Sequence, residues 1–334
     1  MQIYKITIRF LSYIGTPLHS DTIFGHLCWI YRYLYGKERL KEKILHHYET
    51  RPHLIVSCGF PAGYLPRPVL PPLSSSDLEA MVDKYFIKKG KHLLRGLDIL
   101  KKVKKEKFIA KEDMEDIRQD VSEKAVTEIL LCGRINNKGE EITHEQLTHV
   151  ETTIPHNSIS RLSGSVLKGG GFYHSAEMTF KYDIDIYVKV DPEIFDIQTI
   201  KTVFETLGKY GFGKDKSTGK GQFEVLDITQ ENLPQEGNAV MSLSYFVPDE
   251  SLKDGYYNLF TKFGKLGGHY AITEIPFKNP LILMAPGSVF KVKKIKDYYG
   301  IGVRNIHAKT KIKHQTYLFP YFLGLSESKH VSNI

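Results

Sequence analysis

Two strand–helix–strand patterns limit the fold of this chain more than any other feature of its sequence. In the first pattern, residues 2–10 alternate apolar and polar side chains as a half-buried strand does, and residues 53–60 form a second strand. The helix between them has Ser20 and Asp21 as candidate N-cap residues and ends at Gly36. Its apolar face consists of Ile23, Leu27, Ile30 and Leu34.

The second pattern lies in the middle of the chain. Strands are predicted at 172–180 and 182–190, an amphipathic helix at 196–211, and a final strand after residue 221. The apolar face of that helix consists of Ile200, Phe204 and Leu207. Together the two patterns give the order β-α-β-β-α-β, which is typical of a ferredoxin-like or RRM-type fold. We therefore predict an α+β protein whose first domain spans residues 1–232.

Residues 77–150 differ from the segments on either side. They are charged, helical in composition and poor in strand formers, and they carry a dense basic run from Lys84 to Lys107. We predict a helical insertion in the first domain. A solvated helix face is the ordinary explanation of such a run, and a contact with a partner or with RNA is the alternative.

A polar linker at 230–238 precedes a second set of shorter patterns. A short helix or loop is predicted at 254–264. The predicted strands lie at 239–248, 280–292 and 314–325. We predict a second, degenerate RRM-like domain over residues 238–334.

The composition favours a polyanionic partner. Lys and Arg number 46 against 38 acidic residues, which gives a net charge of +8, and nucleic acid is the commonest partner of a basic protein. The cysteines, Cys28, Cys58 and Cys132, lie far apart, which argues against a disulfide framework or a zinc ribbon. No apolar run approaches the roughly 20 residues that span a bilayer, so we expect a cytoplasmic protein with no membrane association, no metal and no cofactor.

The sharpest local feature is the glycine- and lysine-rich loop at 211–221. It differs from a phosphate-binding Walker A loop because five residues separate Gly213 from Gly219, and Gly221 stands where a Mg²⁺-binding hydroxyl is needed. The loop also follows a helix and precedes a strand, which reverses the Walker order. We predict that its backbone N–H groups and lysines hold RNA phosphates, with a plain surface turn as the alternative.

Other candidate contacts come from three further segments. Residues 155–164 are polar and lie next to glycines, and they form either an RNA contact or a network of Asx and Ser turns. Exposed rings next to the loop, Tyr210 or Phe212, are candidates for base stacking, and the basic turn around Arg304, His307 and Lys309 is a candidate for completing the groove. The residues predicted to bind RNA are Gly211, Phe212, Gly213, Lys214, Lys216, Ser217, Thr218, Gly219, Lys220, His156, Asn157, Ser158, Arg161, His19, Ser20 and Arg304.

A catalytic constellation is not evident in the sequence. A metal-independent ribonuclease needs a base for the 2′-hydroxyl, and His19 and His156 are the candidates. Nothing singles out a second acid, and a loop or core-edge position is the ordinary explanation of His19. We therefore predict no catalytic residues.

Four motifs carry a resemblance to a known family. The sequences TPLHSDTIFGHLCW, PHNSISRLSG, GFGKDKSTGKGQFEV and APGSVFKV resemble subunit four of the type III-A CRISPR Csm complex, a member of the RAMP superfamily. The resemblance spans nearly the whole chain. It implies two RRM-like domains and binding of the repeat-derived 5′ handle of the crRNA. It also implies two neighbours, the large polymerase-domain subunit and the backbone subunit, to which the cleavage reactions belong.

Two other functions fit the same sequence. The first is a repeat-processing, metal-independent endoribonuclease of the RAMP superfamily, with His19 as its candidate base. The second is an assembly protein whose basic helical region contacts only acidic partners. Cleavage of repeat RNA without metal would favour the endoribonuclease, whereas failure to bind single-stranded RNA would favour the assembly protein.

Overall fold

The computed structural model describes residues 1–87, 93–136, 141, 147, 149–166, 171–272, 274–304, 306–307 and 313–326. The chain forms two compact units, and each unit draws on separate segments. Unit 1 comprises Met1–Ala62, Leu147–Glu231 and Leu266–Pro276, and unit 2 comprises Gly63–Gln146, Asn232–Lys265 and Phe277–Ile334. The domains predicted from sequence, 1–232 and 238–334, stay a prediction. Each is one continuous stretch, whereas each unit joins three segments and the helical segment lies in unit 2.

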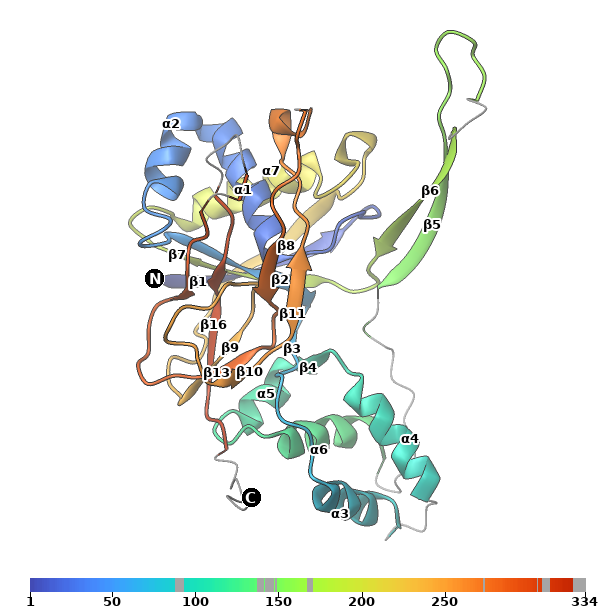
Figure 1. Cartoon of the computed structure of the whole chain (residues 1–334), viewed down its shortest axis with the longest axis vertical. Coiled ribbons are helices and arrows are strands. Elements are labelled where there is room, and N and C mark those ends of the chain that lie inside the picture. Colours follow the sequence, from blue (N-terminus) through green and yellow to red (C-terminus); the bar gives the residue numbers. More distant parts are fainter. Residues whose placement is uncertain are drawn as a thin grey trace. The chain divides into compact units, whose positions relative to one another are not determined.

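Unit 1 is built on a four-stranded antiparallel sheet (Figure 1). Its strands are β1 (Gln2–Phe10), β2 (Leu54–Pro61), β7 (Ile184–Val190) and β8 (Phe223–Gln230), in the spatial order β2-β7-β1-β8. Every residue of β7 is buried, and this strand pairs with β1 on one edge and with β2 on the other. The order is that of a ferredoxin-like sheet, which confirms the predicted β-α-β-β-α-β arrangement.

The helices α1 (Ser20–Tyr35) and α7 (Ile197–Tyr210) pack against each other and against this sheet. Leu27 of α1, Phe204 of α7 and Val188 of β7 line the same small apolar gap. The predicted apolar faces are confirmed except at Leu34, which is 40% exposed. The shorter turns of unit 1 are α2 (Lys37–Leu40), η1 (Lys41–Leu45), η3 (Lys216–Thr218) and η4 (Gly268–Ile272).

The start of α1 differs from the prediction by one or two residues. His19 is the N-cap, with extended backbone angles, and Ser20 and Asp21 are the first two helical residues. Both are buried, so their side chains lie inside the unit. Ser20 thus has no exposed side-chain surface, and its assignment as an RNA contact stays a prediction.

A two-stranded ribbon projects from unit 1 (Figure 1). It consists of β5 (Val150–Asn157) and β6 (Phe172–Thr179), which pair in antiparallel register and form a sheet of their own. The sequence predicted β6 but not β5. One β-bridge, between Ile14 and Met178, joins the ribbon to the chain near β1. Because an isolated two-stranded ribbon is at best marginally stable in water, its order depends on such attachments.

Where the structure describes it, the helical segment of unit 2 contains four helices and one short strand pair. The elements are β3 (Tyr64–Pro66), α3 (Ser75–Tyr85), α4 (Leu93–Lys104), β4 (Phe108–Ala110), α5 (Lys111–Ile117) and α6 (Glu123–Arg134). Phe86, Val103 and Leu131 are fully buried in one core between α3, α4 and α6. The described part of the segment predicted to be helical, residues 77–87 and 93–134, is thus mainly helical, with the short strand β4 inside it. Among the described residues, no helix combines the length and apolar character that a membrane crossing requires.

The rest of unit 2 is mainly strands. A four-stranded antiparallel sheet has the order β10-β13-β9-β16, and the strands of two further pairs, β11–β12 and β14–β15, lie between the strands of this sheet in sequence. The strands are β9 (Ala239–Ser242), β10 (Gly255–Tyr256), β11 (Leu259–Lys262), β12 (Leu281–Met284), β13 (Val289–Lys291), β14 (Tyr299–Gly300), β15 (Tyr317–Leu318) and β16 (Pro320–Leu323). The short helix or loop predicted at 254–264 is therefore wrong in part, since β10 and β11 lie there.

Candidate functional site

The glycine-rich loop between α7 and β8 folds back on itself in a way that requires glycine. Positive φ angles occur at Gly211, Gly213, Asp215, Gly219 and Gly221. The N–H of Phe212 donates to the carbonyl of Gly221 at 2.8 Å. A Cβ on Gly221 would lie 2.0 Å from the carbonyl oxygen of Phe212, which no side chain could tolerate. The glycines therefore close the turn, whatever else the loop does.

Much of the loop's backbone is already hydrogen-bonded within unit 1. The N–H of Lys214 donates to Thr16 Oγ1 at 2.9 Å, and the N–H of Gly213 donates to His26 Nε2 at 3.1 Å. The N–H groups of Phe212, Thr218, Gly219 and Gly221 also donate to carbonyl oxygens of the protein. These groups stabilise the loop itself. Most of the backbone N–H groups that were predicted to hold phosphate thus already donate to acceptors within the protein. The lysine side chains are therefore the main groups that can bind an anion.

His26 of α1 holds the loop by accepting a hydrogen bond from its backbone. Burial, and to a lesser degree the charge of Lys216, lower the pKa of His26 to about 4. Its imidazole is therefore neutral near pH 7, so Nε2 can accept the hydrogen bond from Gly213. The ring of Phe212 packs on His26 with 4.8 Å between centroids and is only 1% exposed. A base-stacking role for Phe212 does not fit this burial, and Tyr210, at 53% exposure, is the accessible ring.

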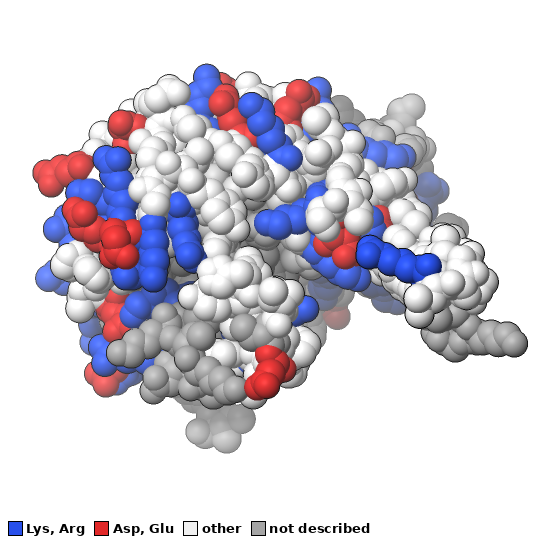
Figure 2. Space-filling model, turned by 90° about the horizontal axis from the view of Figure 1, so that it is seen from above, with Lys and Arg blue, Asp and Glu red and all other residues white. Residues whose placement is uncertain are grey.

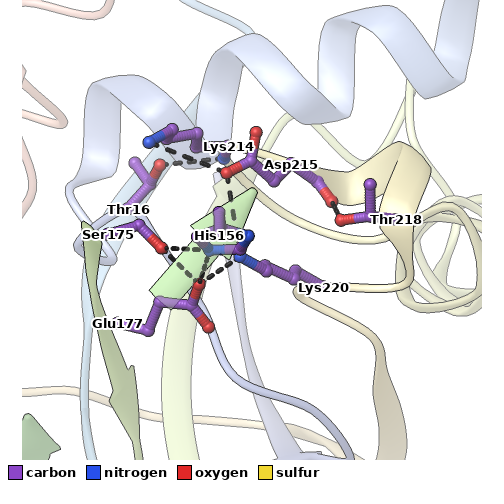
Figure 3. Close-up of polar contacts among 8 residues, drawn as sticks. All are labelled: Thr16, His156, Ser175, Glu177, Lys214, Asp215, Thr218 and Lys220. Atoms are coloured by element: carbon purple, nitrogen blue, oxygen red, sulfur yellow. Dashed lines mark hydrogen bonds and ion pairs between the residues drawn. The ribbon is translucent and has the colours of Figure 1, made fainter. Parts of the chain in front are cut away.

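The loop is tied to the projecting ribbon by a buried ion pair (Figure 3). Lys220 Nζ contacts Glu177 Oε1, and Glu177 on β6 is only 1% exposed. Ser175 Oγ donates to the same oxygen at 2.7 Å and lies 2.8 Å from His156 Nε2 on β5. Burial raises the pKa of the Glu177 carboxyl, but the bonds from Lys220 and Ser175 outweigh burial and leave that pKa below its ordinary value. Glu177 is therefore a carboxylate at neutral pH.

The three lysines of the loop occupy different electrostatic settings. Lys214 is exposed, with Nζ 3.6 Å from Asp215 Oδ2. Lys220 is held by Glu177, with Asp215 Oδ2 a further 3.8 Å away. The side chain of Lys216 forms no hydrogen bond or ion pair with the residues that the structure describes, and partial burial lowers its pKa. A bound anion would supply the missing counter-charge, so Lys216 is the strongest candidate for a phosphate ligand.

The other predicted residues fall into three groups. His156 joins the Glu177 network, whereas Asn157 ends β5, and Ser158 and Arg161 follow it towards the ribbon turn. Thr218 Oγ1 donates to the carbonyl of Asp215, and Ser217 is exposed. Arg304 is exposed in unit 2, His307 there is buried, and Lys309 lies outside the described residues.

Four residues of the site escaped the sequence analysis: Thr16, His26, Ser175 and Glu177. His26 could have been suspected, because it lies on α1 among apolar residues, one turn before Trp29. Ser175 and Glu177 occur at i and i+2 on one strand and so share a face. Their partners are distant in sequence, and no local spacing signals such a contact.

Charge on the visible face of the molecule is dispersed (Figure 2). Lys and Arg side chains lie in separate groups with acidic and uncharged surface between them. In the described part of the chain, no group of three or more His, Cys, Asp or Glu side chains is placed to hold a metal ion.

Comparison with known proteins identifies the fold. No family model and no curated protein sequence matches the chain. A chain in the crystal structure of a Csm1–Csm4 cassette in complex with AMPPNP matches 98% of this chain and 100% of its own length, with a TM-score of 0.56 and 16% identity. A chain from the same cassette in complex with cA4 matches 97% and 100%, with a TM-score of 0.56 and 15% identity. The chain thus has the α+β fold of a Csm4-like subunit, as the sequence resemblance implied.

Proposed function

We propose that this protein is a non-catalytic, RNA-binding subunit of a type III-A CRISPR effector complex. It grips the repeat-derived 5′ handle of the crRNA and bridges the large polymerase-domain subunit and the backbone subunit. The observation that carries the proposal is the likeness of fold over the full length of both chains. A likeness that includes the helical segment and both units is harder to reach by chance than a shared ferredoxin-like core.

The loop supports the RNA-binding part of the proposal. Lys216 is partly buried without a counter-ion among the described residues, and Lys214 is exposed beside it in the sequence. Positive charge that the protein does not neutralise attracts phosphate, and phosphate contacts position a nucleic acid without reading its sequence. Recognition of the handle sequence then depends on contacts between the protein and unpaired bases of the RNA. The exposed ring of Tyr210 is one candidate for such a contact.

The partner assignments rest on relatives. The matched structures are described as Csm1–Csm4 cassettes, so a chain with this fold assembles with a Csm1 subunit in those proteins. We extend that arrangement to this chain, with the large subunit as one neighbour. The backbone subunit follows from the sequence resemblance.

The test is an RNA-binding and cleavage assay in EDTA. Purified protein is mixed with 5′-labelled RNA that contains the repeat, and products are run on native and denaturing gels. Binding without cleavage, lost when the handle is scrambled, is the expected result. The double variant K214A/K216A should bind more weakly and lower the slope of log K against log salt by about 1.4, or about 0.7 for each lost phosphate contact.

A matched control distinguishes the effect of the loop lysines from the effect of losing positive charge anywhere on the protein. Lys201 is an exposed lysine of α7, with Nζ 3.9 Å from Glu205 Oε1, and K201A removes one positive charge outside the loop. K201A should leave the slope unchanged. A discrete cleaved product that disappears in His19→Ala would instead support the repeat-processing endoribonuclease. An unchanged slope in K214A/K216A would exclude the loop as the phosphate site.

A further inference from the structure

A row of aromatic rings begins next to the glycine-rich loop and runs along the outer face of α1. Trp29 and Tyr33 are four residues apart and so lie one turn apart on the helix, with 5.8 Å between ring centroids. Tyr210, the last residue of α7, stacks on Tyr33 at 5.9 Å with 23° between ring planes. Tyr33 and Tyr210 are 50% and 53% exposed. These three residues are called the aromatic row below.

The aromatic row is fixed in place at one end. Residues 267 and 268 press against the indole of Trp29: a Cβ on Gly268 would lie 2.6 Å from Trp29 Cη2, and one on Gly267 would lie 2.8 Å from Trp29 Nε1. The guanidinium of Arg32 lies 5.0 Å from the centroid of the Trp29 ring. Trp29 is thus held on its helix, and it in turn supports Tyr33. A rigid ring loses little conformational entropy when a ligand binds to it.

The charge around the row suits a polyanion. Arg32 and Lys209 form no ion pair with the described residues, so their positive charges are not neutralised within that part of the chain. Arg32 lies on the same face of α1 as Trp29, and Lys209 precedes Tyr210. Aromatic rings interleaved with unneutralised cations are typical of surfaces that hold single-stranded nucleic acid, since bases stack while phosphates meet the cations.

The row is also continuous with the loop. His26, which anchors Gly213, lies one turn before Trp29 on α1, a rise of about 5 Å. Tyr210 directly precedes Gly211, where the loop begins. A single-stranded RNA with a phosphate bound at Lys216 is therefore close to the aromatic row, because the loop and the row are adjacent on unit 1.

We propose that unpaired bases of the single-stranded RNA held by the loop stack on Tyr33 and Tyr210, with Trp29 as their fixed support. This inference rests on the proposed function, because it extends the site of the loop lysines to a second, base-stacking subsite. It assigns RNA affinity to the aromatic face of α1, whereas the only α1 residue predicted from sequence to bind RNA is Ser20, at the start of the helix. A protein partner that buries the same rings is the competing occupant.

The sole tryptophan of the chain gives a direct assay, because the protein's tryptophan emission comes from Trp29 alone. Titration of the full chain with a single-stranded repeat-derived RNA should change that emission. Tyr210→Ala should weaken RNA binding about 5- to 150-fold and leave the salt slope unchanged, since stacking releases no counter-ions. Tyr210→Phe keeps the ring and should bind as the wild type does.

A control tyrosine tests whether loss of any exposed aromatic ring lowers RNA affinity, through misfolding or through loss of non-specific binding. Tyr257 in unit 2 is 47% exposed and stacks on Phe290 at 5.9 Å, so it matches Tyr210 in exposure and ring contact. Tyr257→Ala should leave RNA affinity unchanged.

If K214A/K216A weakens binding but Tyr210→Ala and Tyr33→Ala do not, the stacking subsite is refuted while the proposed function stands. If the tyrosine variants bind RNA normally but no longer assemble with the other subunits, the row is a protein interface. If the wild-type chain binds no RNA, both proposals fail.

Discussion

Replacement of Glu177 by glutamine should release the β5–β6 ribbon from the glycine-rich loop. Glutamine keeps the size and the bond from Ser175 but removes the charge that holds Lys220. The carboxylate is 1% exposed and the Lys220 side chain 15% exposed, so the pair is shielded but open to solvent at the lysine. A hydrogen bond to a charged group contributes about 1.5–3 kcal/mol, and we adopt this range in place of the 3–5 kcal/mol for breaking a fully buried pair.

Hydrogen exchange measures this loss where it occurs. Among the described residues, the ribbon pairs with no strand of unit 1 beyond the bridge at Ile14, so its opening free energy depends strongly on the attachment at Glu177. A loss of 1.5–3 kcal/mol corresponds to about 10- to 150-fold faster amide exchange in β5 and β6. Exchange in β1 and β7 should not change.

Glu151 offers the matched control for this experiment. It lies on β5 with a side chain that is 73% exposed, so E151Q makes the same chemical change on the same ribbon without breaking a buried pair. Ribbon exchange in E151Q should equal that of the wild type. The reasoning is refuted if E177Q exchanges no faster than E151Q. It is also refuted if E177Q binds RNA more tightly than the wild type, because Lys220 would then be a restrained phosphate ligand and not an attachment of the ribbon.

Three further changes test the loop and its supporting helix. The pKa of His26 is about 4 in the folded chain against 6.5 in the unfolded chain, so the unfolded state binds the proton first and the free energy of unfolding falls by up to about 3 kcal/mol as pH falls from 6.5 to 4; denaturant midpoints at pH 7 and pH 4.5 should differ more for the wild type than for His26→Asn. Gly221→Ala should abolish the closed turn and weaken RNA binding, measured on native gels, far more than Gly219→Ala does. The reason is that a Cβ at residue 221 meets backbone atoms, whereas a Cβ at residue 219 does not. Asp196→Ala removes the cap that accepts from the Thr199 N–H and should lower the unfolding free energy by about 1 kcal/mol in a urea titration, with RNA affinity unchanged.

Local periodicity predicted the elements that carry regular burial. The alternation of β1, the apolar faces of α1 and α7, and the closing glycine of each helix are set by neighbours two to four residues away, so a sequence displays them directly. The sheet order then follows from the small number of ways in which these elements can pack.

Other parts of the fold depended on contacts that no local pattern records. Strand β5 contains Pro155 and is largely exposed, which argues against a buried strand, yet a projecting ribbon tolerates both features. The predicted strand at 280–292 is broken into β12 and β13 at Gly287, whose positive φ and approach to the Arg67 carbonyl need tertiary context. In unit 2 most strands have two to four residues, too few to show a period.

The candidate site was predicted in composition but not in the roles of its residues. The glycines and lysines were visible in the sequence, but only their contacts separate Lys216 from Lys220, which is held by a glutamate 43 residues away. Phe212 is likewise aromatic and next to the loop, but its ring is buried against His26. Burial and charge pairing are properties of the folded chain, and they decide which side chains remain available to a ligand.

The interleaved path of the chain restricts how this protein can be divided. The backbone passes from one compact unit to the other after residues 62, 146, 231, 265 and 276, so neither unit is a single stretch of sequence. A truncation at residue 231 would leave unit 1 without residues 266–276, which supply the glycines against Trp29. Expression of separate halves should therefore give poorly folded material, and ribosomal synthesis must be nearly complete before either unit can close.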